Sequence, residues 1–467
     1  MKKLLSIFAL LVAAGAARGG NKIHYYFTRP VNNTVARGEN AVYLNNCAAD
    51  TLAAYISRAK YTLDIAVYNF NLSSGSAVTT AVNNAYNRGV QVRWIYDGSS
   101  TNSGLAGLNA GIPRLGSPTT SAYGIMHNKF LVIDGASTNA ADAIVWTGST
   151  NWTTNQVAGD YNNIVVIQDS ALAHAYIAHF NMMWGGSGMT PSPSASKFGP
   201  DKTDLGRHIF TIEGKRVELY FSPADGTNTQ IQNAINTADK DLYFAMYTFT
   251  DNSDANLIMA KKSAGVYVAG IDDSYSNSYT PYSTFTAGLG ANFKVYSGSD
   301  LYHNKFLIVD QSDVCSDPLV LTGSHNWTVS ANTKNDENTL IIHDDTAANV
   351  YYQSFYANFT ALGGALTAQR GCSVGVPQIV DALAECNIFP NPTTGDIHIS
   401  YTLNAPQTVN VELYDMLGRR VAILADNNLQ AAGQHNLDYT IAAAGIYLAR
   451  ITTGAQQLLR PIVVTTH

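Results

Sequence analysis

One stretch of eight residues occurs twice in this chain, almost unchanged. Residues 127–134 read HNKFLVID, and residues 303–310 read HNKFLIVD. A second motif follows each copy, TGSTNWT at residues 147–153 and TGSHNWT at residues 322–328. Two motifs that recur in the same order and at nearly the same spacing indicate that a whole structural unit is duplicated.

The likeness between the two copies extends upstream of these motifs, since DIAVYNF at residues 64–70 corresponds to YFAMYTF at residues 243–249. Short runs of β-branched and aromatic residues predict strands, and apolar residues four positions apart predict helices. In the first copy we expect strands at 62–69, 90–96, 130–134 and 143–147, and helices at 77–88 and around Tyr176, Phe180 and Trp184. Alternating strands and helices predict an α/β fold, with helices on both faces of each sheet.

The repeated motifs place reactive side chains at matching positions. Residues two apart on a strand point to the same face, so the histidine and the lysine of each motif project together. The Gly-Ser-x-Asn turn after a neighbouring strand brings a hydroxyl and an amide close to them. The candidate site residues are His127, Lys129, Ser149 and Asn151 in the first copy, and His303, Lys305, Ser324 and Asn326 in the second.

Two such copies facing each other would form a basic pocket with two imidazoles, which suits a phosphodiester. The lysines would neutralise the non-bridging oxygens, and the asparagines would donate hydrogen bonds to them. One histidine can attack phosphorus, while the other protonates the leaving alcohol and later activates water. We expect no metal ion and no cofactor, because the lysines supply the positive charge that a cation would bring.

The doubled pattern of His-x-Lys-x4-Asp followed by Gly-Ser-x-Asn resembles the phospholipase D superfamily, over about residues 23–365. The resemblance implies two phospholipase D-like α/β/α sandwich repeats packed as a pseudo-dimer, and a covalent phosphohistidine. It implies that His127 is the nucleophile and His303 the acid and base. Asp134 and Asp310 match the catalytic motif's aspartate, and we expect them to support the local fold rather than touch phosphorus.

The first copy departs from the family pattern at Asn162. Glu337 follows the second motif, where relatives often have a carboxylate that orients a catalytic histidine, and we group it with the substrate-binding residues. The matching residue of the first copy is Asn162, so this carboxylate is missing there unless Asp160 replaces it. We therefore expect the two histidines to differ in pKa, which would suit a division of labour.

The last 80 or so residues have a different sequence pattern, with short alternating strands separated by turns. FPNPTTG at residues 389–395, YDMLGR at 414–419 and GIYLARI at 445–451 mark turns and strands with alternating apolar residues. Such short alternating strands predict a small β-sandwich. The same motifs resemble the C-terminal sorting domain of type IX secretion substrates. The resemblance implies recognition by the type IX secretion machinery, and release from the cell or attachment at its surface.

The N-terminus predicts a signal peptide, because Lys2 and Lys3 precede an apolar run at residues 4–12 and small residues at 14–16. No later stretch reaches the roughly 18 apolar residues of a transmembrane helix. The expected organisation is a signal peptide (1–17), repeat 1 (23–186), a linker (187–214), repeat 2 (215–365), a linker (366–386) and the sorting domain (387–467).

Composition favours some classes of substrate over others but does not identify the substrate. The net charge is −6 and no run of lysine and arginine occurs, which argues against a protein dedicated to binding nucleic acid. The first hypothesis is an exported, monomeric phospholipase D-like hydrolase. The alternatives are an endonuclease acting on DNA or RNA, and a surface-displayed binding protein with an inactive site. The four cysteines allow three pairings, one of which joins Cys47 to Cys315 and Cys372 to Cys386.

Overall fold

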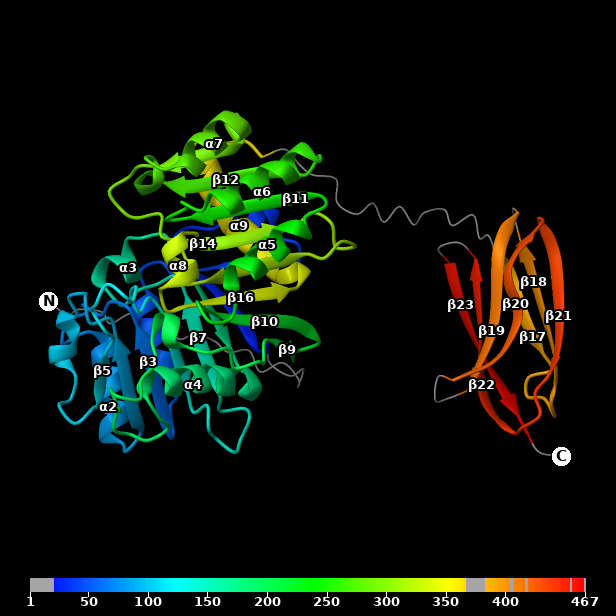
Figure 1. Cartoon of the computed structure of the whole chain (residues 1–467), viewed down its shortest axis with the longest axis horizontal. Helices are drawn as coiled ribbons and strands as arrows, with labels where there is room; N and C mark the ends of the chain where they lie inside the picture. The colour runs from blue at the N-terminus through cyan, green and yellow to red at the C-terminus, as the bar shows by residue number, and fades with distance from the viewer. Residues whose placement is uncertain (1–20, 367–382, 404–405, 416–418, 454–455, 466–467) are drawn as a thin grey trace, which may run out of the picture. The chain divides into compact units, whose positions relative to one another are not determined.

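A computed structural model describes residues 21–366, 383–403, 406–415, 419–453 and 456–465 of the chain (Figure 1). The chain divides into two compact units, Met1–Gly371 and Cys372–His467. The predicted signal peptide lies outside the described residues. Within the described part of the chain, no helix is both long and apolar enough to cross a membrane.

The first repeat is built on a mixed sheet of eight strands in the order β2-β1-β8-β7-β6-β3-β4-β5. Strand β4 pairs in parallel with both β3 and β5. The other central pairs, β3 with β6, β6 with β7, β7 with β8 and β8 with β1, are antiparallel. The strands are β1 (Ile23–Phe27), β2 (Val42–Tyr43), β3 (Thr62–Val67), β4 (Gln91–Tyr96), β5 (Arg114–Gly116), β6 (Lys129–Ile133), β7 (Ile144–Gly148) and β8 (Asn163–Ile167).

The second sheet repeats this topology, in the order β13-β12-β11-β14-β15-β16-β10-β9. Its strands are β9 (Ile209–Ile212), β10 (Lys215–Ser222), β11 (Asp241–Met246), β12 (Tyr267–Asp273), β13 (Phe293–Tyr296), β14 (Lys305–Val309), β15 (Leu319–Gly323) and β16 (Glu337–His343). The sheets differ at one edge, where β2 is parallel to β1 but β9 is antiparallel to β10. Strand β9 comes from the segment expected to be a linker, so part of that segment belongs to the second sheet.

Helices cover both faces of each sheet, as predicted. In the first repeat they are α1 (Ala48–Ile56), α2 (Ala77–Asn87), α3 (Thr154–Ala158) and α4 (Ser170–Trp184). In the second they are α5 (Thr227–Asn236), α6 (Asn252–Ser263), α7 (Thr280–Leu289), α8 (Val329–Thr333) and α9 (Asp345–Ala361). Helices α1 and α2 pack on one face of the first sheet, and α5, α6 and α7 pack on the corresponding face of the second (Figure 1).

The inner faces of the two sheets share one core with α4 and α9. Along β6, Phe130 and Val132 point into this shared core, whereas Leu131 and Ile133 point into the core under α1 and α2. Both faces of the strand are therefore buried, which explains why its sequence is apolar from Phe130 to Ile133. The shared core joins the two repeats into the expected pseudo-dimer.

The C-terminal unit is an antiparallel β-sandwich, as expected. One sheet has the order β17-β18-β21 and the other the order β20-β19-β22-β23. Alternate residues such as Ile397, Ile399 and Tyr401 are buried between the sheets. The strands are β17 (Leu383–Phe389), β18 (Asp396–Leu403), β19 (Gln407–Asp415), β20 (Arg420–Gln430), β21 (Gly433–Thr440), β22 (Gly445–Thr453) and β23 (Gln456–Val464).

The cysteines differ from one of the pairings considered above. Cys47 is a free, exposed thiol, whereas Cys315 is in a disulfide. A bridge between these two residues is therefore wrong. The side chains of Cys372 and Cys386 lie outside those that the structure describes.

A buried ion pair ties the connection between the repeats to the second sheet. Lys202, just after the 3₁₀ turn Gly199–Asp201, places its Nζ 2.8 Å from a carboxylate oxygen of Asp336. The same Nζ donates to the carbonyl oxygen of Ser222, and the Gly199 amide donates to Asp336. Both charged side chains are almost completely buried, so each depends on the other for its charge to be compensated.

Replacing Lys202 by alanine should lower the free energy of unfolding by about 3–5 kcal/mol, because the Asp336 carboxylate would remain buried without a counter-charge. Chemical denaturation of the purified protein measures this change. Lys262→Ala, on an exposed position of α6, is the control and should change stability by less than about 0.5 kcal/mol. Equal stability of the two variants would contradict the structural role given to Lys202.

Candidate active site

The two repeats interlock directly beside the repeated motifs. The amide of His127 donates to the carbonyl oxygen of Asp336 in the second repeat, at 2.9 Å. On the other side, the amide of Leu301 donates to the carboxylate of Asp160 in the first repeat, also at 2.9 Å. Each motif is therefore held against a segment of the opposite repeat, which brings the two motifs to one site.

Each histidine finds its partner in the opposite repeat. Nδ1 of His127 lies 2.8 and 2.9 Å from the two carboxylate oxygens of Glu337. Nδ1 of His303 lies 3.0 Å from Oδ1 of Asn162. Asp160 does not take the place of the missing carboxylate, because its oxygens accept from Leu301 and Gln156 instead. With Nδ1 occupied, Nε2 is the ring atom of each histidine that can react.

The serines of the Gly-Ser-x-Asn turns lie behind the histidines. Ser324 Oγ donates to Glu337 at 2.6 Å, and Ser149 Oγ donates to Asn162 at 2.8 Å. Ser149, Ser324 and Glu337 are completely buried. The two serines bind the histidine partners Asn162 and Glu337, and Glu337 itself binds His127, so the side-chain contacts of all three residues are made within the protein.

The two lysines are buried next to the histidines. Lys129 Nζ donates to the carbonyl of His127 at 2.8 Å, and Lys305 Nζ donates to that of His303 at 3.0 Å. The ring of Tyr68 lies 5.3 Å from Lys129 Nζ, and the ring of Tyr247 lies 5.1 Å from Lys305 Nζ. These contacts hold both ammonium groups at the site.

Burial lowers the pKa of Lys129 to about 7 and lowers the pKa of Lys305 well below its usual value, with the Lys129 charge adding to the effect on Lys305. A bound anion would reverse this shift, because it supplies the missing negative charge. The pair of lysines is thus suited to a phosphate group.

The asparagines of the two turns are available to a ligand. Oδ1 of Asn151 and Oδ1 of Asn326 are buried and have no hydrogen-bond partner among the described residues. Buried polar atoms are normally paired, and an amide oxygen only accepts, so a hydrogen-bond donor of a ligand, such as a hydroxyl or ammonium group, would satisfy them. His325, between Ser324 and Asn326, is buried and both of its ring nitrogens are also unpartnered within the described residues. The sequence analysis did not single it out.

Asp134 and Asp310 lie at the far end of their strands from the histidines. The Asp134 carboxylate accepts from the backbone amides of residues 60–62, and the Asp310 carboxylate accepts from those of residues 239–241. Five residues of strand separate each aspartate from the His-x-Lys end, a distance of about 17 Å. This placement separates them from the reacting groups, and the role of the two aspartates in supporting the fold stays a prediction.

Two pockets adjoin the site. One, of about 430 Å³, is lined by Asn151, Asp160 and Leu301 together with Asn69, Asn71, Thr153, Thr154, Asn155 and Gln156. The other, of about 340 Å³, is lined by Ser99, Thr119, Thr120, Ser121, Tyr123, Gly124, Ile125, Ser330 and Asn335. Neither lining contains a lysine or an arginine, so both pockets are polar but not basic.

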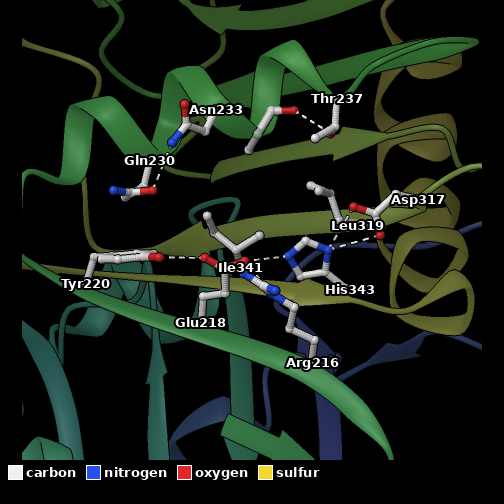
Figure 2. Close-up of a pocket in the computed structure, with 11 residues that line it drawn as sticks. Arg216, Glu218, Tyr220, Gln230, Asn233, Thr237, Asp317, Leu319, Ile341 and His343 are labelled. Carbon is white, nitrogen blue, oxygen red and sulfur yellow. Dashed lines mark hydrogen bonds and ion pairs between the residues drawn. The ribbon is translucent and has the colours of Figure 1, made fainter. Parts of the chain in front are cut away.

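A separate pocket of about 520 Å³ lies on the outer side of the second sheet, beneath α5 (Figure 2). Glu218 accepts hydrogen bonds from Tyr220, Arg216 and His343 there, and His343 also contacts Asp317. Burial raises the pKa of Glu218, but these hydrogen bonds outweigh it and lower the pKa to about 2. The charged groups satisfy one another, which is typical of a structural network.

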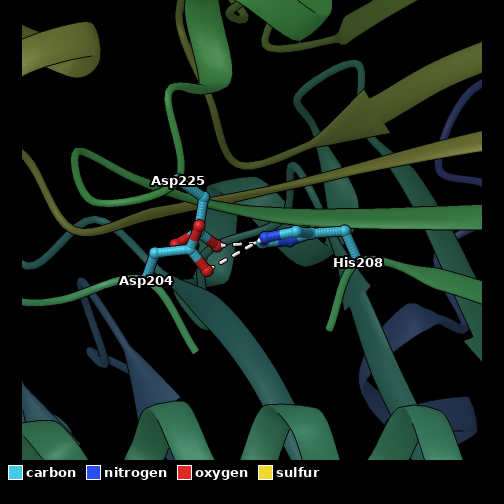
Figure 3. A group of neighbouring side chains, drawn as sticks. All are labelled: Asp204, His208 and Asp225. Atoms are coloured by element: carbon cyan, nitrogen blue, oxygen red, sulfur yellow. Dashed lines mark hydrogen bonds and ion pairs between the residues drawn. The ribbon is translucent and has the colours of Figure 1, made fainter. Parts of the chain in front are cut away.

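Asp204, His208 and Asp225 form another polar cluster (Figure 3). Both ring nitrogens of His208 are already engaged, Nε2 with Asp204 at 3.0 Å and Nδ1 with the carbonyl oxygen of Leu219 at 2.9 Å. Asp225 accepts from the amide of Phe221. None of the three residues belongs to the repeated motifs, and their side chains are engaged with one another and with the backbone of β10.

The duplicated α/β fold and the paired His-Lys motifs define a phospholipase D-like protein, and comparison with known proteins identifies the family. The family model described as "Cardiolipin synthase, PLD-like domain" matches residues 52–184 and 231–358, which together make up more than half of the chain. The chain therefore belongs to this family of the phospholipase D superfamily. Residues 387–465 match the "Secretion system C-terminal sorting domain", so the chain also carries a type IX sorting domain.

Curated relatives match about a third of the chain. A "Mitochondrial cardiolipin hydrolase" of Drosophila melanogaster is 32% identical over 144 residues, which are 28% of this chain and 55% of that protein. A "Phospholipase D" of Rickettsia bellii is 28% identical over 152 residues, which are 32% of this chain and 71% of that protein. The chain thus spans about half the length of the first of these relatives.

Among solved structures, a phosphatidylserine synthase of Haemophilus influenzae is similar with a TM-score of 0.52. The match covers 74% of this chain and 88% of that one at 14% sequence identity. At this identity the likeness supports the fold alone. It extends over both repeats, in agreement with the pseudo-dimer described above.

Removing the Asp310 carboxylate should weaken the fold without removing the reacting groups. Asp310→Ala leaves the backbone amides of residues 239–241 without an acceptor, and we expect the free energy of unfolding to fall by about 2–4 kcal/mol. Below the melting transition, turnover per folded molecule should stay within about threefold of wild type. Asp239→Ala, an exposed carboxylate beside it, is the control. Lost turnover with unchanged stability would show that Asp310 acts in the chemistry instead.

Proposed function

We propose that this chain is an exported phosphodiesterase that hydrolyses phospholipids through a phosphohistidine, without a metal ion or cofactor. The observation that carries the proposal is the pair of histidines whose Nδ1 atoms are held by Glu337 and Asn162, each beside a buried lysine. One Nε2 attacks phosphorus and the other serves the leaving alcohol.

Lys129 and Lys305 bind the non-bridging oxygens and provide the charge that a metal ion supplies in other phosphodiesterases. Asn151 and Asn326 contact the substrate beside them. Ser149 and Ser324 hold the histidine partners Asn162 and Glu337, and Asp134 and Asp310 fix the strands that carry the motifs.

A phospholipid suits the surroundings of the site better than a nucleic acid. A nucleic acid presents phosphates on both sides of the scissile bond, and proteins bind them mainly through lysine and arginine. The two adjoining pockets are lined by neutral polar side chains and the carboxylate of Asp160, and by no lysine or arginine. The names of the curated relatives, cardiolipin hydrolase and phospholipase D, also concern phospholipids.

An endonuclease acting on DNA or RNA is the second candidate, because the same two histidines and two lysines would cleave any accessible phosphodiester. A surface-displayed binding protein with an inactive site is the third. The complete His-Lys pairs of both repeats, with their hydrogen bonds, argue against the loss of activity.

The sorting domain indicates delivery to the cell surface or the exterior. We propose that a signal peptide at residues 1–17 starts this route and that the type IX secretion machinery completes it. One chain supplies both halves of the site, so a monomer should be active.

His127→Ala and His303→Ala should each lower hydrolysis of bis-p-nitrophenyl phosphate by roughly 10³-fold or more, because either loss removes one of two groups that act as a unit. Release of p-nitrophenol measures the rate, with and without EDTA, which should have no effect on the wild type. His174→Ala, on an exposed position of α4, is the matched control. Full activity of either site variant would contradict a shared site, and inactivation by EDTA would indicate a metal ion.

Purified protein should release phosphatidic acid from vesicles of phosphatidylcholine or phosphatidylglycerol and leave single- and double-stranded DNA intact at the same enzyme concentration. The reason is the lack of cationic side chains in the pockets beside the site. Thin-layer chromatography of the lipids and gel electrophoresis of the DNA measure the two activities. Cleavage of DNA without release of phosphatidic acid would establish the nuclease alternative.

A further inference from the structure

The pocket beside Asn151 contains two hydrogen-bond acceptors that the protein leaves open. Oδ1 of Asn69 and Oδ1 of Asn151 are buried, and neither has a partner among the residues that the structure describes. Both side chains line the pocket of about 430 Å³. An oxygen that has lost water without gaining a donor is unfavourable, so this pocket is suited to a ligand that brings donors.

The neighbouring polar groups of the same pocket are already engaged or can only donate. Oδ1 of Asn71 accepts from the amide and the hydroxyl of Ser103 at 3.0 and 3.2 Å, so its remaining polar group is the NH2 donor. The Asp160 carboxylate accepts from Gln156 at 2.7 Å and from the Leu301 amide at 2.9 Å. The lining therefore offers a ligand two neutral acceptors and a donor.

The second pocket is the counterpart of the first by the internal symmetry of the fold, but it is closed upon itself. Oδ1 of Asn335 accepts from Ser330 at 3.0 Å, and its Nδ2 donates to Glu337 at 3.3 Å. Of the described side chains in this lining, none has a buried polar atom without a partner. Three of its residues, Ile125, Ser330 and Asn335, occupy the positions of Leu301, Asn155 and Asp160 in the first pocket.

The two repeats differ in the residues around the pockets although their motifs agree. Where the first repeat has Asn69 and Asn71, the second has Thr248 and Thr250. The phosphate of a diester is bonded to two ester oxygens in the same way, which matches the duplicated His-Lys pairs. The two alcohols that it joins are different, so residues that differ between the repeats are suited to distinguish them.

We propose that the pocket lined by Asn69, Asn71 and Asn151 binds the head group of the substrate, and that this head group is a polyol, an alcohol with free hydroxyl groups beside the esterified one. The inference rests on the proposed phosphodiesterase function and deepens it. Hydroxyls both donate and accept, so neighbouring hydroxyls satisfy the two open oxygens and accept from Asn71. Asn151 belongs to the repeated motif, which places the pocket next to the phosphate. The volume lies within the range of small-molecule sites, about 300–1,000 Å³.

Charged head groups fit this lining less well. A quaternary ammonium such as choline has no N–H to donate, and proteins bind it on aromatic faces. None of the described residues that line the pocket is aromatic. A primary ammonium such as ethanolamine needs an opposite charge when it is buried, and the carboxylate of Asp160 already accepts two hydrogen bonds. An uncharged polyol avoids both difficulties.

Short-chain lipids below their critical micelle concentration test the head group without the influence of a membrane surface. We expect kcat/KM for dihexanoyl phosphatidylglycerol to exceed that for dihexanoyl phosphatidylethanol by about tenfold or more, because a site that binds a hydroxyl discriminates against an analogue without it. These two lipids carry the same charge. The phosphatidylcholine and phosphatidylethanolamine analogues should be poorer substrates than phosphatidylglycerol, and chromatography of the released dihexanoyl phosphatidic acid measures all four rates.

Asn69→Leu tests the pocket itself, since it removes one open oxygen while keeping a side chain of similar size. The preference for phosphatidylglycerol over phosphatidylethanol should fall by about tenfold. The melting temperature should stay the same or rise, because no protein donor loses its partner. Thr120→Val, in the second pocket, is the matched control and should leave the preference unchanged. A merely structural role of Asn69 would change both rates together and leave their ratio as it is.

The outcomes separate this inference from the proposed function. Equal rates on phosphatidylglycerol and phosphatidylethanol, or a faster rate on the choline or ethanolamine lipid, would overturn the polyol assignment and leave a phospholipase in place. A preference that is lost in Thr120→Val but kept in Asn69→Leu would move the head group to the second pocket and contradict the proposal. Wild-type protein that hydrolyses bis-p-nitrophenyl phosphate but none of the four lipids would overturn the phospholipid function, and this inference with it.

Discussion

The exchange of histidine partners between the two repeats is the contact on which the rest of the site depends. His127 is held by Glu337 and His303 by Asn162, so neither repeat has a complete His-partner pair of its own. The exchange requires the motif segments to lie against each other, which the backbone contact between His127 and Asp336 secures. The shared core under α4 and α9 in turn keeps the two sheets in register. The site is therefore complete only when the two repeats have packed together.

Burial gives this site its chemical character. Two lysines and two histidines are nearly inaccessible to water, and the removal of water disfavours the charged form of each. Such an arrangement is unfavourable by itself, because the groups are buried and the charges of Lys129 and Lys305 lie close to each other. An anionic substrate compensates these charges. The electrostatic strain of the free protein therefore favours a phosphate group, and it strengthens every polar contact made to that group.

Much of the fold and part of the site could be predicted from the chain itself. The apolar runs gave the strands within one or two residues, and the doubled His-Lys motif indicated which groups meet. The roles of the supporting residues could not be read in the same way. Ser149 and Ser324 look like ligands in a Gly-Ser-x-Asn turn, but they face inward to Asn162 and Glu337. The contact of Asn162 with His303 joins residues that are 141 positions apart. The alignment of the two copies singled out Asn162 but did not show which histidine it contacts. Cys47 likewise remains free despite an available partner in the sequence.

The sequence by itself determined the duplication, the α/β class, the reacting residue types and the separate β-sandwich, because local periodicity and motif spacing are properties of neighbouring residues. Only the tertiary structure decided which side chains support which histidine, and which backbone amides the carboxylates of Asp134 and Asp310 bind. The physical reason is that hydrogen bonds and charge interactions act over a few ångströms in space, whereas the partners here come from opposite repeats. The asymmetry between the two histidines therefore emerges only when the repeats pack together.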